Sequence, residues 1–180
     1  MNIRATILAA TIVIAAMIAA ASCKDLETYS EIPRVEFKKV FLADTTDKLD
    51  NKVKLQEITL QVIDGDGNLG LNRDEADSLY NLFITIYKKE KGLYQRTNDT
   101  IGKYRIPYKQ PIGQNKYLRA EVIVNMTTSL SILQYDTIRY EIYIKDRDDN
   151  TSETITSCDI PIRQNGTVYA DGKLEEESAQ

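Results

Sequence analysis

Hydrophobic and polar residues alternate along several stretches of the chain at the period of a β-strand. The clearest stretch is 138–144, in which every second residue is apolar or aromatic, and the same period runs through 55–62, 81–88 and 118–125. A shorter alternating run at 34–40 predicts a first, edge-type strand. Charged, turn-forming segments separate these runs, and no helical period interrupts them. The pattern predicts an all-β sandwich of about seven strands.

The last predicted hairpin combines the strand at 138–144 with an extended run at 154–160, joined by a turn-rich segment. This hairpin resembles the final hairpin of bacterial immunoglobulin-like and fibronectin type III-like domains, which implies a sandwich of that type over residues 33–162. Beyond Pro161 the chain becomes polar and acidic. Residues 163–180 are therefore expected to form a flexible acidic tail.

The first 22 residues carry one charged side chain, Arg4, followed by an uninterrupted run of apolar and small residues to Ala21. The run is typical of a secretion signal and is short for a membrane span, which needs about 20 apolar residues. The residues before Cys23 are small, and this junction resembles the lipobox of bacterial lipoproteins. The resemblance implies cleavage after residue 22 and lipid attached to Cys23. An ordinary secretion signal with an incidental cysteine is the alternative.

A lipid on Cys23 implies a protein of the cell envelope, held at the outer membrane, with its periplasmic or surface orientation left open. Acyl chains on a single residue anchor a protein without spanning the bilayer. Residues 23–32 are polar and aperiodic, which suits a tether between the lipid and the sandwich.

The composition excludes several classes of function. The chain has no histidine, so Ser-His-Asp and Cys-His catalysis and histidine-based zinc sites are absent. The formal net charge is −4, which provides no basic field for nucleic acid. With Cys23 assigned to lipid, Cys158 is left as the one free thiol, and no disulfide is expected within the domain.

Residues 64–75 form the densest cluster of oxygen donors in the chain. Calcium prefers six to eight oxygen ligands, and glycines between acidic residues let a loop curl around the ion. Placed on the positions of a twelve-residue calcium loop, the candidate ligands are Asp64, Asp66, Asn68, Gly70 through its carbonyl, Asn72 and Glu75. Leu69 stands where such loops need glycine, and a strand precedes the loop, so an EF-hand is not expected. The alternative is a tight turn whose Asp side chains cap its own amides.

The segment Asp-Gly-Asp-Gly-Asn-Leu-Gly at 64–70 is also part of a wider resemblance. Together with the lipobox and the strand at 136–147, it is similar to a family of uncharacterised Gram-negative lipoproteins of the Bacteroidota type. The resemblance implies an immunoglobulin-like β-sandwich and brings no assigned activity.

Two further patterns are candidates for chemistry. Asp followed by Ser or Thr resembles a bacterial O-glycosylation motif, with turns into strands as the alternative; the candidate acceptors are Thr45, Ser78, Thr100 and Thr137. A second acidic cluster, Asp146, Asp148 and Asp149, falls on a predicted hairpin turn. We expect solvent to keep these carboxylates ionised there, which does not suit a catalytic acid.

These features favour a non-enzymatic, membrane-tethered binding or envelope-assembly module, with calcium as the candidate cofactor. The expected partner is an envelope protein complex or an extracellular ligand. The alternative is a metal-dependent hydrolase that uses the carboxylates of residues 64–75 or 146–149, and this alternative requires those acids to line a pocket.

Overall fold

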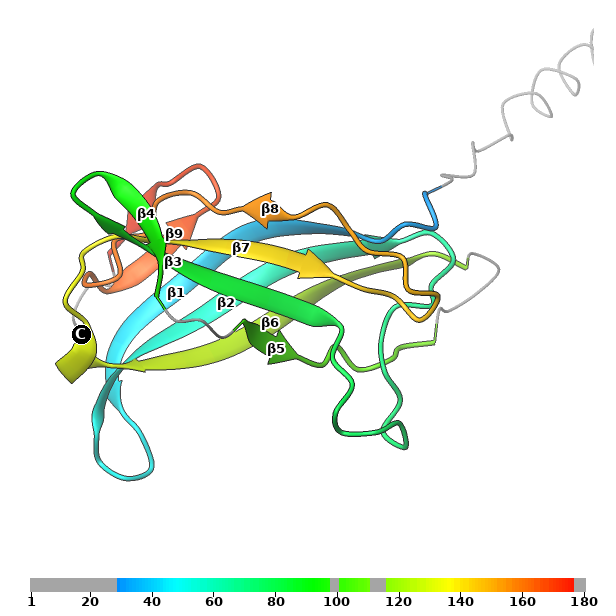
Figure 1. The fold of residues 1–180 in the computed structure, drawn as a ribbon, viewed down its shortest axis with the longest axis horizontal. Helices are drawn as coiled ribbons and strands as arrows, with labels where there is room; N and C mark the ends of the chain where they lie inside the picture. Colours follow the sequence, from blue (N-terminus) through cyan, green and yellow to red (C-terminus); the bar gives the residue numbers. More distant parts are fainter. Residues whose placement is uncertain (1–28, 98–100, 111–115, 177–180) are drawn as a thin grey trace, which may run out of the picture.

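The computed structural model describes residues 29–97, 101–110 and 116–176, in which the chain forms ten β-strands and one short 3-10 helix (Figure 1). The strands make two antiparallel sheets, which enclose one hydrophobic core. The all-β sandwich is therefore confirmed. The strand count exceeds the expected seven because several strands have only two to four residues, too few to produce a visible alternation. No helix in the described part of the chain is long and apolar enough to cross a membrane.

The first sheet contains the three longest strands, in the order β10-β9-β1-β2-β6. Its strands are β1 (Arg34–Thr46), β2 (Lys52–Asp64), β6 (Leu118–Ser129), β9 (Gly166–Tyr169) and β10 (Leu174–Glu175). The short helix η1 (Leu130–Ile132) follows β6. Within the described residues β6 pairs only with β2, so β6 forms one edge of this sheet.

The second sheet has the order β4-β3-β7-β8, with β5 also paired to β3. Its strands are β3 (Leu82–Glu90), β4 (Leu93–Arg96), β5 (Gly102–Tyr104), β7 (Ile138–Ile144) and β8 (Ile155–Thr156). Strands β4 and β5 pair with successive parts of β3, while β7 takes its other edge. The chain passes from β3 to β4 through a hairpin turn at Lys91 and Gly92, and both residues have positive φ, as a tight hairpin turn requires.

The core faces of the strands follow the sequence pattern closely. On β7, Ile138, Tyr140, Ile142 and Ile144 are all buried, and the alternating residues between them are half-exposed. Full burial of such side chains contributes about 1.5–3 kcal/mol each. One polar contact joins the two sheets inside this core: the hydroxyl of Tyr140 donates to Oε1 of Gln56 at 2.7 Å.

The structure places the first strand differently from the sequence prediction. Strand β1 is not an edge strand, because it pairs with β2 on one side and with β9 on the other. The predicted edge character came from charged residues on one face of the run, and these side chains face solvent on the outer side of the sheet. A half-buried central strand and an edge strand give the same alternation.

The C-terminal segment also differs from the expected tail. Residues 166–175 form β9 and β10 in the first sheet, so the sandwich extends beyond the expected boundary at 162; residues 177–180 lie outside the described part. Val168 is fully buried. Gly166 has φ +130°, and a Cβ there would lie 2.2 Å from the carbonyl oxygen of Glu175. The segment is polar in sequence because the strand buries only one face of four residues.

A buried lysine fixes this C-terminal segment to the β1–β2 hairpin. Lys54 is fully buried, and its ammonium group forms an ion pair with Asp44 at 2.5 Å. The same group donates to Oδ1 of Asn165 at 2.7 Å and to the carbonyl of Gln164 at 3.3 Å. A buried charge of this kind requires all of these partners, so the 164–165 turn is part of the folded domain.

Candidate functional site

The outer edge of β6 is open along the whole strand. Strand β6 pairs with β2 from Leu118, opposite Asp64, to Ser129, opposite Val53. No other described strand pairs with its second edge. The backbone N–H and C=O groups that point away from β2 therefore have no ladder partner among the described strands. An edge of this kind is a template for pairing with another strand.

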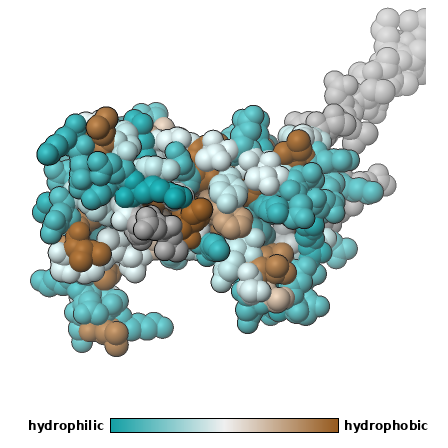
Figure 2. Space-filling view, viewed as in Figure 1, coloured by the Kyte–Doolittle hydropathy of each residue, from teal (hydrophilic) through white to brown (hydrophobic). Residues whose placement is uncertain are grey.

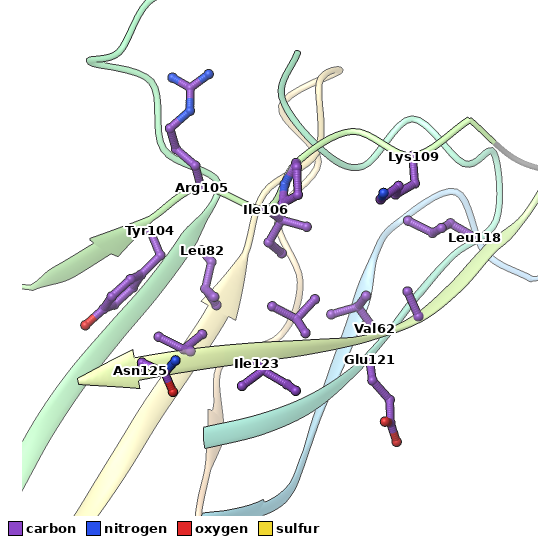
Figure 3. Close-up of a pocket in the computed structure, with 14 residues that line it drawn as sticks. Val62, Leu82, Tyr104, Arg105, Ile106, Lys109, Leu118, Glu121, Ile123 and Asn125 are labelled. Carbon is purple, nitrogen blue, oxygen red and sulfur yellow. The ribbon is translucent and has the colours of Figure 1, made fainter. Parts of the chain in front are cut away.

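A hollow of about 450 Å³ lies between this edge strand and the second sheet (Figure 3). Its lining is mainly apolar and includes Val62, Leu82, Tyr104, Ile106, Ala120 and Val122. Val62, Leu82 and Ile106 lie around the space between the two sheets, whereas the charged ends of Arg105 and Glu121 point away from it. The hollow therefore offers an apolar surface with charged groups outside it.

The hollow exists because the second sheet covers β6 incompletely. On this side the second sheet ends with β5 and β4, which have only three and four residues, against twelve in β6 (Figure 1). Leu60 and Val62 on β2 are fully buried, but Ala120, Val122 and Met126 on β6 stay half-exposed although they pack against the same core. Except at Val124, which is buried, the inward face of β6 thus lacks the cover that its neighbour receives.

Two further hollows continue along β6 toward its C-terminal end. One of about 310 Å³ shares Tyr104 with the first and includes Met126, and the next, of about 420 Å³, shares Ile86 and Thr128 with the second. The last of the three ends near Ser129 and is the most polar. We call these three hollows and the open edge beside them the β6 groove. In the space-filling view, hydrophobic patches are scattered over an otherwise mainly hydrophilic face (Figure 2).

One wall of the β6 groove is fixed by the loop that follows β2. Asn81 is almost fully buried, and its side chain accepts from the N–H of Ile106 at 2.6 Å and donates to the Ile106 carbonyl at 3.2 Å. Leu71 donates its N–H to the same carbonyl at 2.9 Å and accepts from the N–H of Tyr108 at 3.0 Å. These hydrogen bonds join the wall to the loop.

The same loop contains the acidic motif. Asp64 ends β2, is fully buried, and accepts through Oδ2 from the N–H of Leu69 at 2.7 Å. Asp66 accepts from the N–H of Asn68 at 3.1 Å. Gly70 has φ +115°, and a Cβ there would lie 2.5 Å from the Cα of Tyr108. This arrangement contains the self-capping turn that was the alternative to a metal loop.

The second acidic cluster, after β7, is only partly exposed. Asp148 and Asp149 are exposed as expected, but the expectation is wrong for Asp146, which is only 7% exposed. Oδ1 of Asp146 accepts from the N–H groups of Asp148 at 2.9 Å and Asn150 at 2.8 Å, and Oδ2 accepts from the Asn150 amide at 2.8 Å. Asp146 is buried because it organises the turn from inside.

The two acidic segments meet at Asn68. Its amide nitrogen donates to Oδ2 of Asp66 and to Oδ2 of Asp148, each at 2.8 Å. Burial raises the pKa of Asp64 to about 6; the Leu69 N–H opposes this shift, and the charges of Asp66 and Asp146 add to it. Oδ1 of Asp64 and Oδ1 of Asn68 are both inaccessible to solvent and have no hydrogen-bond partner among the described residues.

Only the first half of the predicted calcium ligand set comes together. The Gly70 carbonyl accepts from Nε of Arg147 at 2.9 Å, and the Glu75 carboxylate pairs with the same guanidinium at 3.0 Å. The carbonyl of Asn72 accepts from Arg105 at 3.0 Å. Two arginines thus bind the candidate ligands in the second half of the loop. The spacing of the ligands along the sequence does not reveal these contacts. As they stand, no three His, Cys, Asp or Glu side chains of the described residues form a metal-binding group.

The remaining predicted site residues are separate from these features. Cys23 and Thr100 lie outside the described residues. Thr45 and Ser78 are exposed, whereas Thr137 is half-buried and its carbonyl accepts from the backbone of β3. Cys158 is a free, half-buried thiol whose pKa is raised by burial.

Two features were missed at the level of sequence. The contact of Asp148 with Asn68 has a weak signal in the sequence, because 146–150, like 64–68, is rich in side chains with oxygen atoms. The open edge of β6 has no signal, because its alternation resembles that of the neighbouring central strand. Comparison of the chain with protein-family models, with curated proteins and with solved structures finds no match.

Proposed function

We propose that this protein is a non-enzymatic binding module of the bacterial cell envelope, anchored through lipid on Cys23, which holds an extended segment of a partner protein in the β6 groove. The observation that carries the proposal is the open twelve-residue edge of β6 beside a mainly apolar hollow. The partner segment adds a strand to the first sheet, and its side chains complete the cover of the core.

The shape of the β6 groove suits a strand better than a compact ligand. A twelve-residue edge is about 40 Å long at ~3.3 Å per residue, and the three hollows follow one another along it. In strand addition, main-chain hydrogen bonds provide affinity, and pockets for alternate side chains provide specificity. The partner segment therefore has apolar residues at every second position beside Leu118 to Val124, and more polar residues beside Ser129.

The position of the acidic residues supports a binding role over the hydrolase alternative. A metal-dependent hydrolase needs its carboxylates in a pocket that admits substrate. None of the three hollows is lined by residues of 64–75 or 146–149, and the acids on their linings are Glu121 and Glu90. The charged end of Glu121 points away from the hollow.

Site-specific photo-crosslinking in the native membrane tests the proposal. A photoreactive residue replaces Ile123, which lies on β6 and is 58% exposed. The matched control replaces Lys39, which is exposed on the central strand β1 of the same sheet. We expect a covalent adduct with a second polypeptide from position 123 and none from position 39.

A charge placed in the β6 groove makes the test specific. Ala120→Lys puts an ammonium group on the groove lining and should remove most of the adduct from position 123, while thermal unfolding confirms that the variant is folded. An adduct of equal yield at positions 123 and 39, no adduct at either, or an adduct unaffected by Ala120→Lys would each refute strand binding.

The lipid anchor is tested separately. Cys23→Ala should abolish labelling by an acyl-chain probe, and persistent label would contradict the anchor.

A further inference from the structure

Four carboxylates without an ion-pair partner gather where the loop after β2 meets the turn after β7: they belong to Asp64, Asp66, Asp146 and Asp148. The basic residues of this turn are engaged elsewhere. Lys145 pairs with Asp149, and Arg147 pairs with Glu75. Among the described residues, no lysine or arginine neutralises the four carboxylates.

One of these carboxylates has an oxygen without a partner in the described part of the chain. Oδ1 of Asp64 is inaccessible to solvent and has no hydrogen-bond partner there, while the residue as a whole is fully buried. Its charged neighbours are the carboxylates of Asp66 and Asp146, which have the same sign. A buried carboxylate oxygen without a donor or a cation is strongly unfavourable, and folded proteins contain few of them. A proton shared with Asp66 or a bound cation would satisfy this oxygen, and only a cation would also offset the charges of Asp66 and Asp146.

The side chain of Asn68 lies between one carboxylate oxygen of Asp66 and one of Asp148. Its amide nitrogen lies 2.8 Å from Oδ2 of Asp66 and 2.8 Å from Oδ2 of Asp148, while its own Oδ1 is buried without a partner. A half-turn of this amide exchanges its nitrogen and oxygen and directs the oxygen toward the two carboxylates. The carboxylates then lose their donor and need a cation instead.

We propose that Asp64, Asp66, Asn68 and Asp148 bind one calcium ion, which links the loop after β2 to the turn after β7. All the donor atoms are oxygens, and calcium accepts six to eight oxygens in irregular geometry, with water completing the set. Magnesium requires a stricter octahedral arrangement and binds such a site less well. No three of these carboxylates converge as the described residues stand, so binding requires the Asp side chains to move toward the ion in addition to the turn of Asn68.

This ligand set differs from a continuous twelve-residue loop. It takes three residues from the acidic motif and one from a turn 80 residues later in the chain. Asp146 acts as a positioning residue, because its oxygens hold the N–H groups of Asp148 and Asn150. The loop after β2 also holds the wall of the β6 groove through Leu71, so the ion would stabilise that wall.

Thermal unfolding of the purified full chain tests the site. The protein is first treated with a chelator and then measured with about 1 mM calcium or the same concentration of magnesium. Extracellular calcium modules commonly bind at ~10⁻⁴ M, and at that affinity we expect calcium to raise Tm by about 3–6 °C. Magnesium should raise it by less, and a calorimetric titration should show one calcium ion per chain.

Two neighbouring aspartates provide a matched pair of variants. Asp148→Asn removes a proposed ligand from an exposed position and should abolish the calcium shift without changing Tm in chelator. Asp149→Asn alters the adjacent exposed residue, which pairs with Lys145, and should keep the full shift. Asp64→Asn should abolish the shift as well; if this buried variant does not fold, Asp148→Asn decides the question.

The proposal is overturned if calcium leaves Tm of the wild-type chain unchanged, or if magnesium raises it equally. It is also overturned if Asp148→Asn and Asp149→Asn respond alike. Failure of this test leaves strand binding in the β6 groove untouched, because the crosslinking experiment does not depend on calcium.

Discussion

The hydrogen bond between Tyr140 and Gln56 provides a direct test of how the two sheets are joined. Tyr140 on β7 and Gln56 on β2 are both at most 1% exposed, and the tyrosine hydroxyl donates to Oε1 of Gln56 at 2.7 Å. Burial raises the pKa of Tyr140 well above its ordinary value, so the hydroxyl stays protonated and remains a donor. Gln56 in turn donates to the hydroxyl of Thr128 on β6 at 2.9 Å.

The expected cost follows from these contacts. Tyr140→Phe preserves the ring and creates no large cavity, but it leaves a buried amide oxygen without its donor, which should cost about 1–3 kcal/mol of unfolding free energy. Gln56→Leu removes the acceptor and leaves the Tyr140 hydroxyl without a hydrogen-bond partner, which should cost a similar amount of unfolding free energy. The double variant replaces both partners by apolar groups, so it should cost less than the sum, with a coupling energy of about 1–2 kcal/mol.

Chemical denaturation of the wild type, both single variants and the double variant measures this cycle, and thermal unfolding should show about 2–4 °C for each kcal/mol. Far-UV circular dichroism checks that all four proteins keep the β fold. Additive single effects, or a Tyr140→Phe variant as stable as the wild type, would refute the reasoning that this hydrogen bond joins the sheets.

Two further predictions concern the C-terminal strands and the surface charges. A chain that ends at residue 162 loses the buried Val168 and the partners of Lys54 in the 164–165 turn, so it should lose cooperative thermal unfolding. A chain that ends at residue 176 should keep cooperative unfolding. Equal melting temperatures of the two chains would contradict the C-terminal pairing. Partial burial raises the pKa of Asp159, but hydrogen bonds from Tyr94, Lys89 and Arg139 lower it by a larger amount. The resulting pKa is about 2. Because this folded pKa lies below the ordinary value near 3.9, Asp159 stabilises the protein above pH ~4 and loses that contribution as the pH falls toward 2. Denaturant titrations at pH 4 and pH 2 should therefore show a larger loss for the wild type than for Asp159→Asn, and parallel losses would count against the assignment.

The sequence by itself determined the local character of the chain. Alternation at 138–144 fixed which side chains of β7 face the core, because successive side chains of a strand point to opposite faces wherever the strand lies. The tight turn at Lys91 and Gly92 is local in the same way, whereas the need for glycine at position 70 comes from the backbone of Tyr108, a distant part of the chain. The lack of histidine is also read from the sequence alone, and so is the resemblance of the junction before Cys23 to a lipobox; the lipid anchor stays a prediction.

The tertiary structure decided which segments are neighbours. Alternation is the same on a central strand and on an edge strand, so only sheet pairing shows that β1 is central and that β6 is open. The pairing of β9 with β1 depends on contacts across more than a hundred residues, and the link from Asn68 to Asp148 spans 80. Such contacts depend on how the sheets pack and not on the spacing of residues along the chain. For that reason two residues of the turn after β7 divide the loop that looked like a single calcium motif: Asp148 accepts from Asn68 in its first half, and Arg147 donates to Gly70 in its second half.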